Sequence, residues 1–310
     1  VIGGTLTDHP RMQWTNEDPY SALVRKFNPQ VRITDLSGQH HLSHAAAAFY
    51  ASGFDTALAV VVDGTGNLLS TVYDQERNLA IQGYETESVF LCSYPAQFEL
   101  VYKRLCSQAP NSTNIRTYTD GTVFYDDSVT ITKAYEAVSE YLGFGFIEAG
   151  KTMGLAPYGE RDERIPPLFV DRWGNKNLLI PMYPAGALID EARHPHLHRL
   201  QPSSTWHHDE YATPDVAKNL AWHVQQESQQ QVGDIIQQAI EKTGEKNVIL
   251  SGGYALNCVA NYHLLERFPD VNFYIDPIAH DGGSAIGLAD RKSTRLNSSH
   301  TDISRMPSSA

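Results

Sequence analysis

The sequence lacks a hydrophobic run long enough to span a membrane, which requires roughly 20 apolar residues, and it shows no signal-peptide pattern. We therefore expect a chain that neither crosses a membrane nor is secreted. Cysteine is also scarce: the three present are Cys92, Cys106 and Cys258. Because they are odd in number and have no metal-type spacing, they predict free thiols and a cytoplasmic location rather than disulfides or a zinc site.

Basic residues are few as well. The 24 lysines and arginines are outnumbered by 36 acidic residues, which gives a formal net charge of −12. A polyanion would be repelled by this charge, so the composition argues against general nucleic-acid binding. The 310 residues, 41% of them hydrophobic, are enough for one large or two modest domains with a proper core.

The most informative stretch is QHHLSHAAAAFYASGFDTALAVVVDGTG, residues 39–66. His40 and His44 are four residues apart and lead into a run of good helix formers, so both imidazoles should project from one helix face. Such a pair can chelate a divalent metal ion. His41 and His44 form a competing pair, and two histidines at helical spacing also occur by chance without any metal.

A buried strand and a glycine turn follow this helix. Ser52 and Gly53 should end the helix, and the apolar, β-branched run from Ala57 to Val62 predicts a strand covered on both faces. Asp63 to Gly66 (DGTG) then turns the chain. An acid at a strand exit can reach a metal, and the glycines allow backbone N–H groups to approach a phosphate, although DGTG is also typical of an ordinary hairpin turn.

A second glycine-rich segment is GFGFIEAGKTMGLAPYG, residues 143–159. Gly150, Gly154 and Gly159 would permit close backbone approach, and Lys151 could pair with a phosphate or a carboxylate. A glycine turn after a helix requires no ligand, so this segment alone does not decide between a ligand-binding loop and a purely structural turn. A cluster of histidines in the next segment suggests metal binding, but beside prolines and arginines in a loop such residues are more often solvated surface: His194, His196, His198, His207 and His208.

The last part of the chain alternates strand and helix. A long helix should begin with Thr213 as N-cap and Pro214 at its first position and end at Gly244. Strands at 247–250 and 271–275 each lead through a glycine turn into a helix, at 255–267 and 284–289. This alternation predicts a parallel sheet. The turns Ser251-Gly252-Gly253 and His280-Asp281-Gly282-Gly283 are typical of an anion or nucleotide cradle.

Other expected elements carry less chemistry. We expect strands in a meander over 67–90 and at 30–34, and helices over 20–26, 94–106 and 131–141. The tract Gln225 to Gln231 should be an exposed face of the long helix. Both ends look artificial. The chain starts without methionine, residues 290–300 can be back-translated as a sequencing-library adapter, and residues 304–310 fit the far end of that adapter, with an index at 301–303. We therefore expect an internal fragment with a tail that contributes nothing to the fold, the alternative being a genuine flexible tail.

Four blocks in order resemble the signature blocks of the O-carbamoyltransferases that act on nodulation factors and on antibiotics such as tobramycin and cephamycins. The blocks are HHLSHAAAAFYASGFDTALAVVVDGTG, EAGKTMGLAPYG, SGGYALNCVAN and DGGSAIGLA. The resemblance implies an α/β fold of the actin-like, sugar-kinase and heat-shock ATPase superfold, with ribonuclease H-like subdomains. It implies that residues 1–289 are a carbamoyl-transfer domain, truncated at both ends, whose two subdomains meet around 130–245. An adenylate-forming domain would be absent.

The resemblance also implies an activity. The absent domain would make carbamoyl-adenylate from carbamoyl phosphate and ATP, and the present domain would pass the carbamoyl group to a hydroxyl of a small molecule or sugar. The implied metal ligands, for Fe²⁺ or a similar divalent ion, are His40, His44, Asp63 and Asp281, and the first three would be catalytic. The implied nucleotide contacts are Thr65, Gly66, Lys151, Gly154, Ser251, Gly252, Gly253, Asn257 and Gly282.

Two positions depart from the family pattern. Tyr254 stands where a small valine is usual and could crowd the nucleotide side, and His280 stands where glycine is commoner and could add a ligand or a base. The alternative function is a kinase, an ATPase or a non-catalytic nucleotide-binding module of the same superfold. Kinases of that fold need acids and glycines but no paired histidines, so the HxxxH spacing discriminates between the two hypotheses.

Overall fold

The computed structural model describes residues 19–33, 38–74, 79–106, 116–117, 123–125, 130–163, 165, 168–169, 214–287 and 289. None of the helices in these ranges is long and apolar enough to cross a membrane. Three expectations lie outside the described residues: the N-cap role of Thr213, the histidine-containing segment from 194 to 208, and the tail from 290 to 310.

The strand β1 (Thr56–Val62) lies at the centre of the fold, and its side chains alternate between two cores. Ala57, Ala59 and Val61 pack with the alanines and Phe49 of α2 (His40–Ser52). The intervening Leu58, Val60 and Val62 pack in the larger core on the other face. Six of its seven residues are buried, which confirms the expected strand with both faces covered.

The strands form one mixed sheet in the order β5-β6-β4-β3-β1-β7-β8, with β2 paired to β3. β1 runs parallel to β7 and β7 parallel to β8, whereas β3 is antiparallel to β1, β2 and β4. The parallel sheet expected from the last part of the chain is therefore one half of a larger sheet. The remaining strands are β2 (Leu68–Asp74), β3 (Leu79–Ser93), β4 (Gln97–Cys106), β5 (Arg116–Thr117), β6 (Val123–Tyr125), β7 (Asn247–Ser251) and β8 (Asn272–Ile275).

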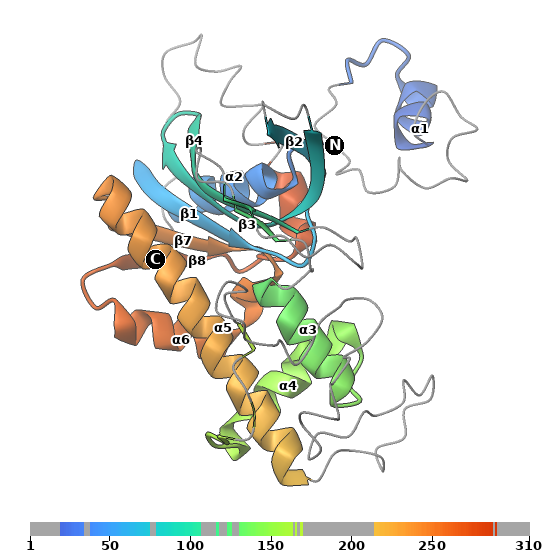
Figure 1. Cartoon of the computed structure of the whole chain (residues 1–310). Coiled ribbons are helices and arrows are strands. Elements are labelled where there is room, and N and C mark those ends of the chain that lie inside the picture. The colour runs from blue at the N-terminus through green and yellow to red at the C-terminus, as the bar shows by residue number, and fades with distance from the viewer. Residues whose placement is uncertain are drawn as a thin grey trace.

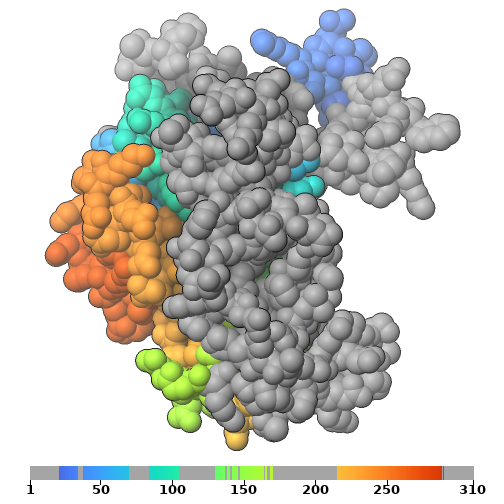
Figure 2. All heavy atoms as spheres, viewed as in Figure 1, coloured from blue at the N-terminus to red at the C-terminus, as the bar shows by residue number. Residues whose placement is uncertain are grey.

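Helices cover both faces of the sheet (Figure 1). α2 packs on one face, and α5 (Pro214–Thr243) runs across the other together with α3 (Ile131–Tyr141) and α6 (Cys258–Arg267). Figure 2 shows the segment from α5 to α6 along one flank of the molecule. The shorter helices are α1 (Pro19–Phe27), η1 (Phe146–Glu148), α4 (Ala149–Leu155), η2 (Ala156–Tyr158), η4 (Gly253–Leu256) and η5 (Asp281–Gly283).

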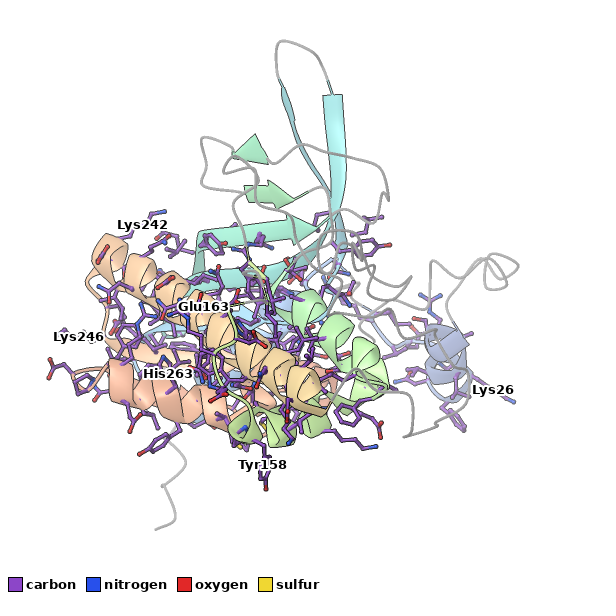
Figure 3. All side chains as sticks on the ribbon, turned by 60° about the horizontal axis from the view of Figure 1, so that its bottom comes forward. Lys26, Tyr158, Glu163, Lys242, Lys246 and His263 are labelled. Carbon is purple, nitrogen blue, oxygen red and sulfur yellow. The ribbon has the colours of Figure 1, made fainter. Side chains whose placement is uncertain are left out.

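The long helix α5 ends as expected. Gly244 follows it with a φ of 75°, a left-handed conformation that glycine adopts without the steric cost of a Cβ atom. Lys242 in its last turn donates to the carbonyl of Val101 at 3.0 Å and so ties this end of α5 to β4. In Figure 3, Lys242 lies at this end of the helix and Tyr158 lies at the opposite end of the helical layer.

Two secondary-structure expectations were wrong. Residues 97–106 form β4 rather than a helix, because they pair with β3 along their whole length, and strand pairing of this kind outweighs local propensity. Residues 30–33 form no strand: Asn28 closes a turn by accepting from the N–H groups of Gln30 and Val31, at 3.2 and 3.1 Å.

The glutamine tract of α5 is also not the exposed face we expected. Gln225 and Gln229 are 1% and 3% exposed, and Ser228 between them is fully buried. The Gln225 amide accepts from the Tyr135 hydroxyl at 2.8 Å and exchanges hydrogen bonds with Asn257. Because these polar groups form hydrogen bonds inside the protein, they avoid the free-energy cost of burying an unpaired polar group.

Candidate metal centre

Two histidines of the first two turns of α2 form one side of the site. His40 is the first residue of the helix and His44 lies one turn later, so the helical spacing brings their Nε2 atoms to 3.3 Å from each other. His44 is fully buried and His40 is partly exposed. Both nitrogens therefore face one point from the same helix face.

Asp63 reaches that point from the carboxyl end of β1. Its Oδ2 lies 2.9 Å from Nε2 of His40 and 3.9 Å from Nε2 of His44. Its other oxygen accepts the N–H of Gly253 at 3.0 Å, and its carbonyl accepts from Thr132 of α3 at 2.7 Å. Asp63 is thus fixed by two other parts of the chain.

Asp281 completes the group from η5, after β8. Its Oδ1 lies 3.5 Å from Nε2 of His40 and 3.4 Å from Nε2 of His44. The four ligand atoms all lie within 4.8 Å of one another, and this is the group of potential metal ligands found within the described part of the chain. The expectation that His40, His44, Asp63 and Asp281 converge is confirmed.

The four side chains fit a divalent metal ion. Ligand atoms bound at about 2.0–2.3 Å lie at most about 4.6 Å apart, so the 4.8 Å spread needs shifts of only a few tenths of an ångström to close around one ion. Two imidazoles and two carboxylates suit a borderline metal such as Fe²⁺ or Zn²⁺ better than Mg²⁺ or Ca²⁺. The Asp281 side chain is 75% exposed, so the site opens toward solvent on that side.

Strong charge coupling accompanies this convergence. Burial opposes protonation of His40, but its hydrogen bonds to Asp281 and Asp63 prevail and raise its pKa from 6.5 to about 10. Burial likewise opposes ionisation of Asp63, yet the bond to His40 and the nearby histidines lower its pKa to about 2. Hydrogen bonds to His40 and His44 hold the pKa of Asp281 well below its usual range.

These shifts predict how stability depends on pH when metal is removed. His40 contributes stability that is complete below its unfolded pKa of 6.5 and is lost as the pH rises through about 10. The ionised Asp63 contributes stability that is complete above its unfolded pKa of 3.8 and is lost as the pH falls through about 2. The excess free energy of unfolding of the wild type over His40→Ala, from urea titrations in chelator, should be largest between pH 3.8 and 6.5. A difference that did not change with pH would contradict the coupling.

His41 does not belong to the site, so the competing pair of His41 and His44 is ruled out as the ligand pair. Its Nδ1 lies 2.8 Å from the Ser88 hydroxyl, and burial lowers its pKa to about 4. Gly66 packs directly on this ring, since a Cβ atom there would lie 2.7 Å from Cδ2 of His41. The need for glycine at 66 is therefore explained by packing.

The glycine turn after β7 packs against the end of β1, next to Asp63. Gly252 has a φ of 87°, and a Cβ atom there would lie 2.4 Å from the carbonyl oxygen of Val62, so only glycine fits. Ser251 donates to Asp276 at 3.2 Å. Asn257 caps α6 by accepting from the N–H of Ala260 at 3.0 Å and also bonds to Gln225, so its amide is committed inside the protein.

The remaining expected contacts lie on other elements. Lys151 of α4 pairs with Glu148 at 2.8 Å and lies over the ring of Phe144, 5.9 Å from its centroid. Gly154 on the same helix faces open space, whereas Gly159 packs on the backbone of Lys218. Thr65 donates to the carbonyl of Gly64 at 2.7 Å, and the N–H of Gly282 donates to Nδ1 of His280 at 3.0 Å.

The two departures from the family pattern have structural roles. Tyr254 does not crowd a nucleotide side: it is 8% exposed in the core, and its hydroxyl donates to Ser228 at 2.8 Å. Burial raises its pKa, as expected for a core phenol. His280 is exposed and caps η5 instead of joining the four ligand candidates.

Sequence reasoning missed a partly buried ion pair next to the site. Lys133 and Glu136 of α3 pair at 2.9 Å, with side chains 9% and 18% exposed. Glu136 faces the turn after β1, because a Cβ atom at Gly64 would lie 3.0 Å from its Oε1 and 3.8 Å from Nζ of Lys133. Burial raises the pKa of Glu136, and the charge of Asp63 adds to this effect. The one available signal was two charges three residues apart on an amphipathic helix, which usually marks a solvated face.

The fold and the site together define the class: an α/β protein in which a helix and the carboxyl ends of parallel strands bring two histidines and two aspartates together. The family model described as the carbamoyltransferase N-terminus matches residues 18–290, and the chain belongs to this family. The family inferred from the four sequence blocks is confirmed.

Relatives agree with this assignment. The nodulation protein NolNO of Sinorhizobium fredii (strain NBRC 101917 / NGR234) is 29% identical over 286 residues, which cover 89% of this chain and 34% of that protein. The nodulation protein NolO of Bradyrhizobium diazoefficiens is 28% identical over 264 residues, which cover 83% of this chain and 38% of NolO. The chain therefore spans about a third of the length of these relatives.

A solved structure shares the fold. Full-length HypF in the phosphate- and nucleotide-bound form is similar with a TM-score of 0.50 and 12% sequence identity, over 89% of this chain and 45% of that chain. At this identity the likeness shows the fold alone.

Proposed function

We propose that this chain transfers a carbamoyl group from carbamoyl-adenylate to a hydroxyl of a small-molecule or sugar acceptor. The observation that carries the proposal is the convergence of four metal-ligand atoms within 4.8 Å. Membership of the carbamoyltransferase N-terminus family supports it. Carbamoyl-adenylate would come from carbamoyl phosphate and ATP through a separate adenylate-forming domain, and the superfold would be that of the actin-like ATPases.

The proposed metal is Fe²⁺ or a similar divalent ion, held by His40, His44, Asp63 and Asp281. When bound, it would supply Lewis-acid polarisation of the carbamoyl carbonyl, on which negative charge grows during attack by the hydroxyl. The chain itself orients this centre: Gly253 and Thr132 hold Asp63, and the helical spacing of α2 holds the two imidazoles.

The nucleotide would lie along the glycine turns that follow β1 and β7. The N–H groups of Gly64 and Thr65 donate to no other residue in the described ranges, so they can face a phosphate, and Lys133 lies beside them. Asp63 and Glu136 flank the same turn. The proposed nucleotide contacts are Thr65, Gly66, Lys151, Gly154, Ser251, Gly252, Gly253 and Gly282, whereas the Asn257 amide is committed to Ala260 and Gln225.

Glu136 is the proposed proton acceptor. As the acceptor oxygen bonds to the carbamoyl carbon, the bond from that carbon to the AMP phosphate breaks, and the hydroxyl proton passes to the Glu136 carboxylate. The nearby Lys133 keeps this carboxylate ionised, while burial and the charge of Asp63 raise its pKa and so its basicity. AMP leaves as an anion beside Lys133.

The activity can be tested without knowledge of the natural acceptor. With Fe²⁺ under anaerobic conditions, the chain should transfer the carbamoyl group of carbamoyl-adenylate to water and so release AMP. Chelation of the metal should abolish this release. ATP hydrolysis with Mg²⁺ that persists in His44→Ala, without any reaction of carbamoyl-adenylate in the wild type, would instead favour a kinase or ATPase of the same superfold.

A further inference from the structure

The two histidines of the metal centre are not held equally well by their own helix. His44 lies in the second turn of α2 and is fully buried. His40 is the first residue of α2, where backbone N–H groups lack partners within the helix and the turn frays most easily. A ligand at this position needs support from outside the helix.

The usual local support is missing. Gln39, which precedes the helix, makes no side-chain capping hydrogen bond, and the first turn carries no acidic residue. Side-chain caps typically contribute about 1 kcal/mol, so their absence leaves the first turn dependent on tertiary contacts. Ser43 only bonds back to the carbonyl of His40, at 2.6 Å.

Asn67 supplies the missing cap from the far end of the DGTG turn. Its Oδ1 accepts the N–H of His40 at 2.7 Å, across 27 residues of sequence. In the sequence, the ligand candidate Asp63 lies between His40 and Asn67. One amide thereby couples the start of α2 to the loop that carries Asp63.

Asn67 is itself anchored on β3. Its N–H donates to Oε2 of Glu85 at 3.2 Å, and its carbonyl accepts the N–H of Glu85 at 3.0 Å. Glu85 is 2% exposed and is paired with Lys103. A buried ion pair is a poor source of stability but a rigid support, and here it lies directly behind the loop between Asp63 and Asn67.

We infer that Asn67 is a positioning residue that caps α2 from a distance and thereby holds the His40 imidazole in place for the metal. This inference rests on the proposed function, because it assumes that the four ligand candidates bind a metal. Groups that orient metal ligands typically account for 10–100-fold in metal affinity. Asn67 acts through the backbone of His40 and needs no contact with the metal.

The test uses Co²⁺ alone as the probe, since its visible absorption reports both affinity and coordination. Asn67→Ala should raise the Kd for Co²⁺ by about 10–100-fold and alter the absorption bands. Asn67→Asp keeps an acceptor oxygen at the same position and should restore binding to near the wild-type value. Wild-type affinity and spectrum in Asn67→Ala would overturn the inference.

Asn247→Ala is the matched control. It removes two asparagine hydrogen bonds, from Nδ2 to the carbonyl of Thr56 at 3.0 Å and from Asn272 to Oδ1 at 2.9 Å, at the opposite end of β1 from Asp63. It should leave Co²⁺ binding unchanged.

Two outcomes separate the inference from the proposed function. If the wild type binds no Co²⁺ under any condition, the metal centre fails and the inference fails with it. If the wild type binds Co²⁺ and Asn67→Ala binds it equally well, only the inference fails. Should Asn67→Ala not fold, Asn67→Ser, which withdraws the acceptor from His40 but keeps a polar side chain, carries the same comparison.

Discussion

Replacing His44 by alanine is expected to lower carbamoyl transfer by the full-length protein by about 10³-fold or more. His44 is fully buried with its Nε2 within 3.4 Å of both His40 and Asp281. In the proposed function its loss would remove one of four ligands and with it the metal, whose Lewis acidity would contribute several kcal/mol to transfer, at a factor of ten for each 1.36 kcal/mol. His40→Ala should act in the same direction.

Adenylate formation separates this effect from loss of folding. In the full-length protein, release of pyrophosphate from ATP and carbamoyl phosphate should persist in His44→Ala while carbamoylated product disappears, so that carbamoyl-adenylate accumulates. His263→Ala on α6 is the control and should retain both activities. Transfer at the wild-type rate by His44→Ala would mean that the histidine pair is incidental and would favour the kinase-like alternative.

Glu136→Gln is expected to lower the rate constant for AMP release from carbamoyl-adenylate by about 10²–10⁴-fold, the usual range for loss of a general base. The amide keeps the shape and can still accept from Lys133, so the KM for carbamoyl-adenylate and the Kd for Co²⁺ should change little. The residue can no longer accept the proton. Lost metal binding in this variant would mean that Glu136 supports the metal centre instead.

The control for this variant is Glu241→Gln on the exposed face of α5, where the carboxylate accepts from Gln237 at 2.7 Å. It should release AMP at the wild-type rate. Release by Glu136→Gln at that same rate would contradict the role of Glu136 as the proton acceptor while leaving the metal-dependent transfer itself in place.

Local sequence patterns predicted those parts of the fold whose hydrogen bonds or packing are local. The α2 helix with Gly53 after it, the apolar strand β1 and the long helix α5 with Gly244 after it all have such patterns. β4 was missed because its structure depends on pairing with β3. The buried glutamines of α5 were missed because their partners, Tyr135 and Asn257, come from distant parts of the chain.

The ligand set was predicted from the resemblance to the O-carbamoyltransferases, and the topology is consistent with it, whereas the surroundings of the site were not predicted. His40 and His44 share a helix face, and the acids follow strands whose carboxyl ends meet at one edge of the sheet, so their convergence follows from topology. Lys133 and Glu136 look like a solvated pair until α3 is packed against the Asp63 turn. Asn67 carries no motif at all, because its role depends on a hydrogen bond to a helix start 27 residues away.

The central claim is that His40, His44, Asp63 and Asp281 bind one divalent metal ion. Anomalous diffraction at the iron edge, from crystals of the chain grown or soaked anaerobically with Fe²⁺, tests it most directly. We expect a single strong peak per chain, about 2.0–2.3 Å from Nε2 of both histidines and from one oxygen of each aspartate. An empty position between these four side chains in crystals that bind iron elsewhere would contradict the claim.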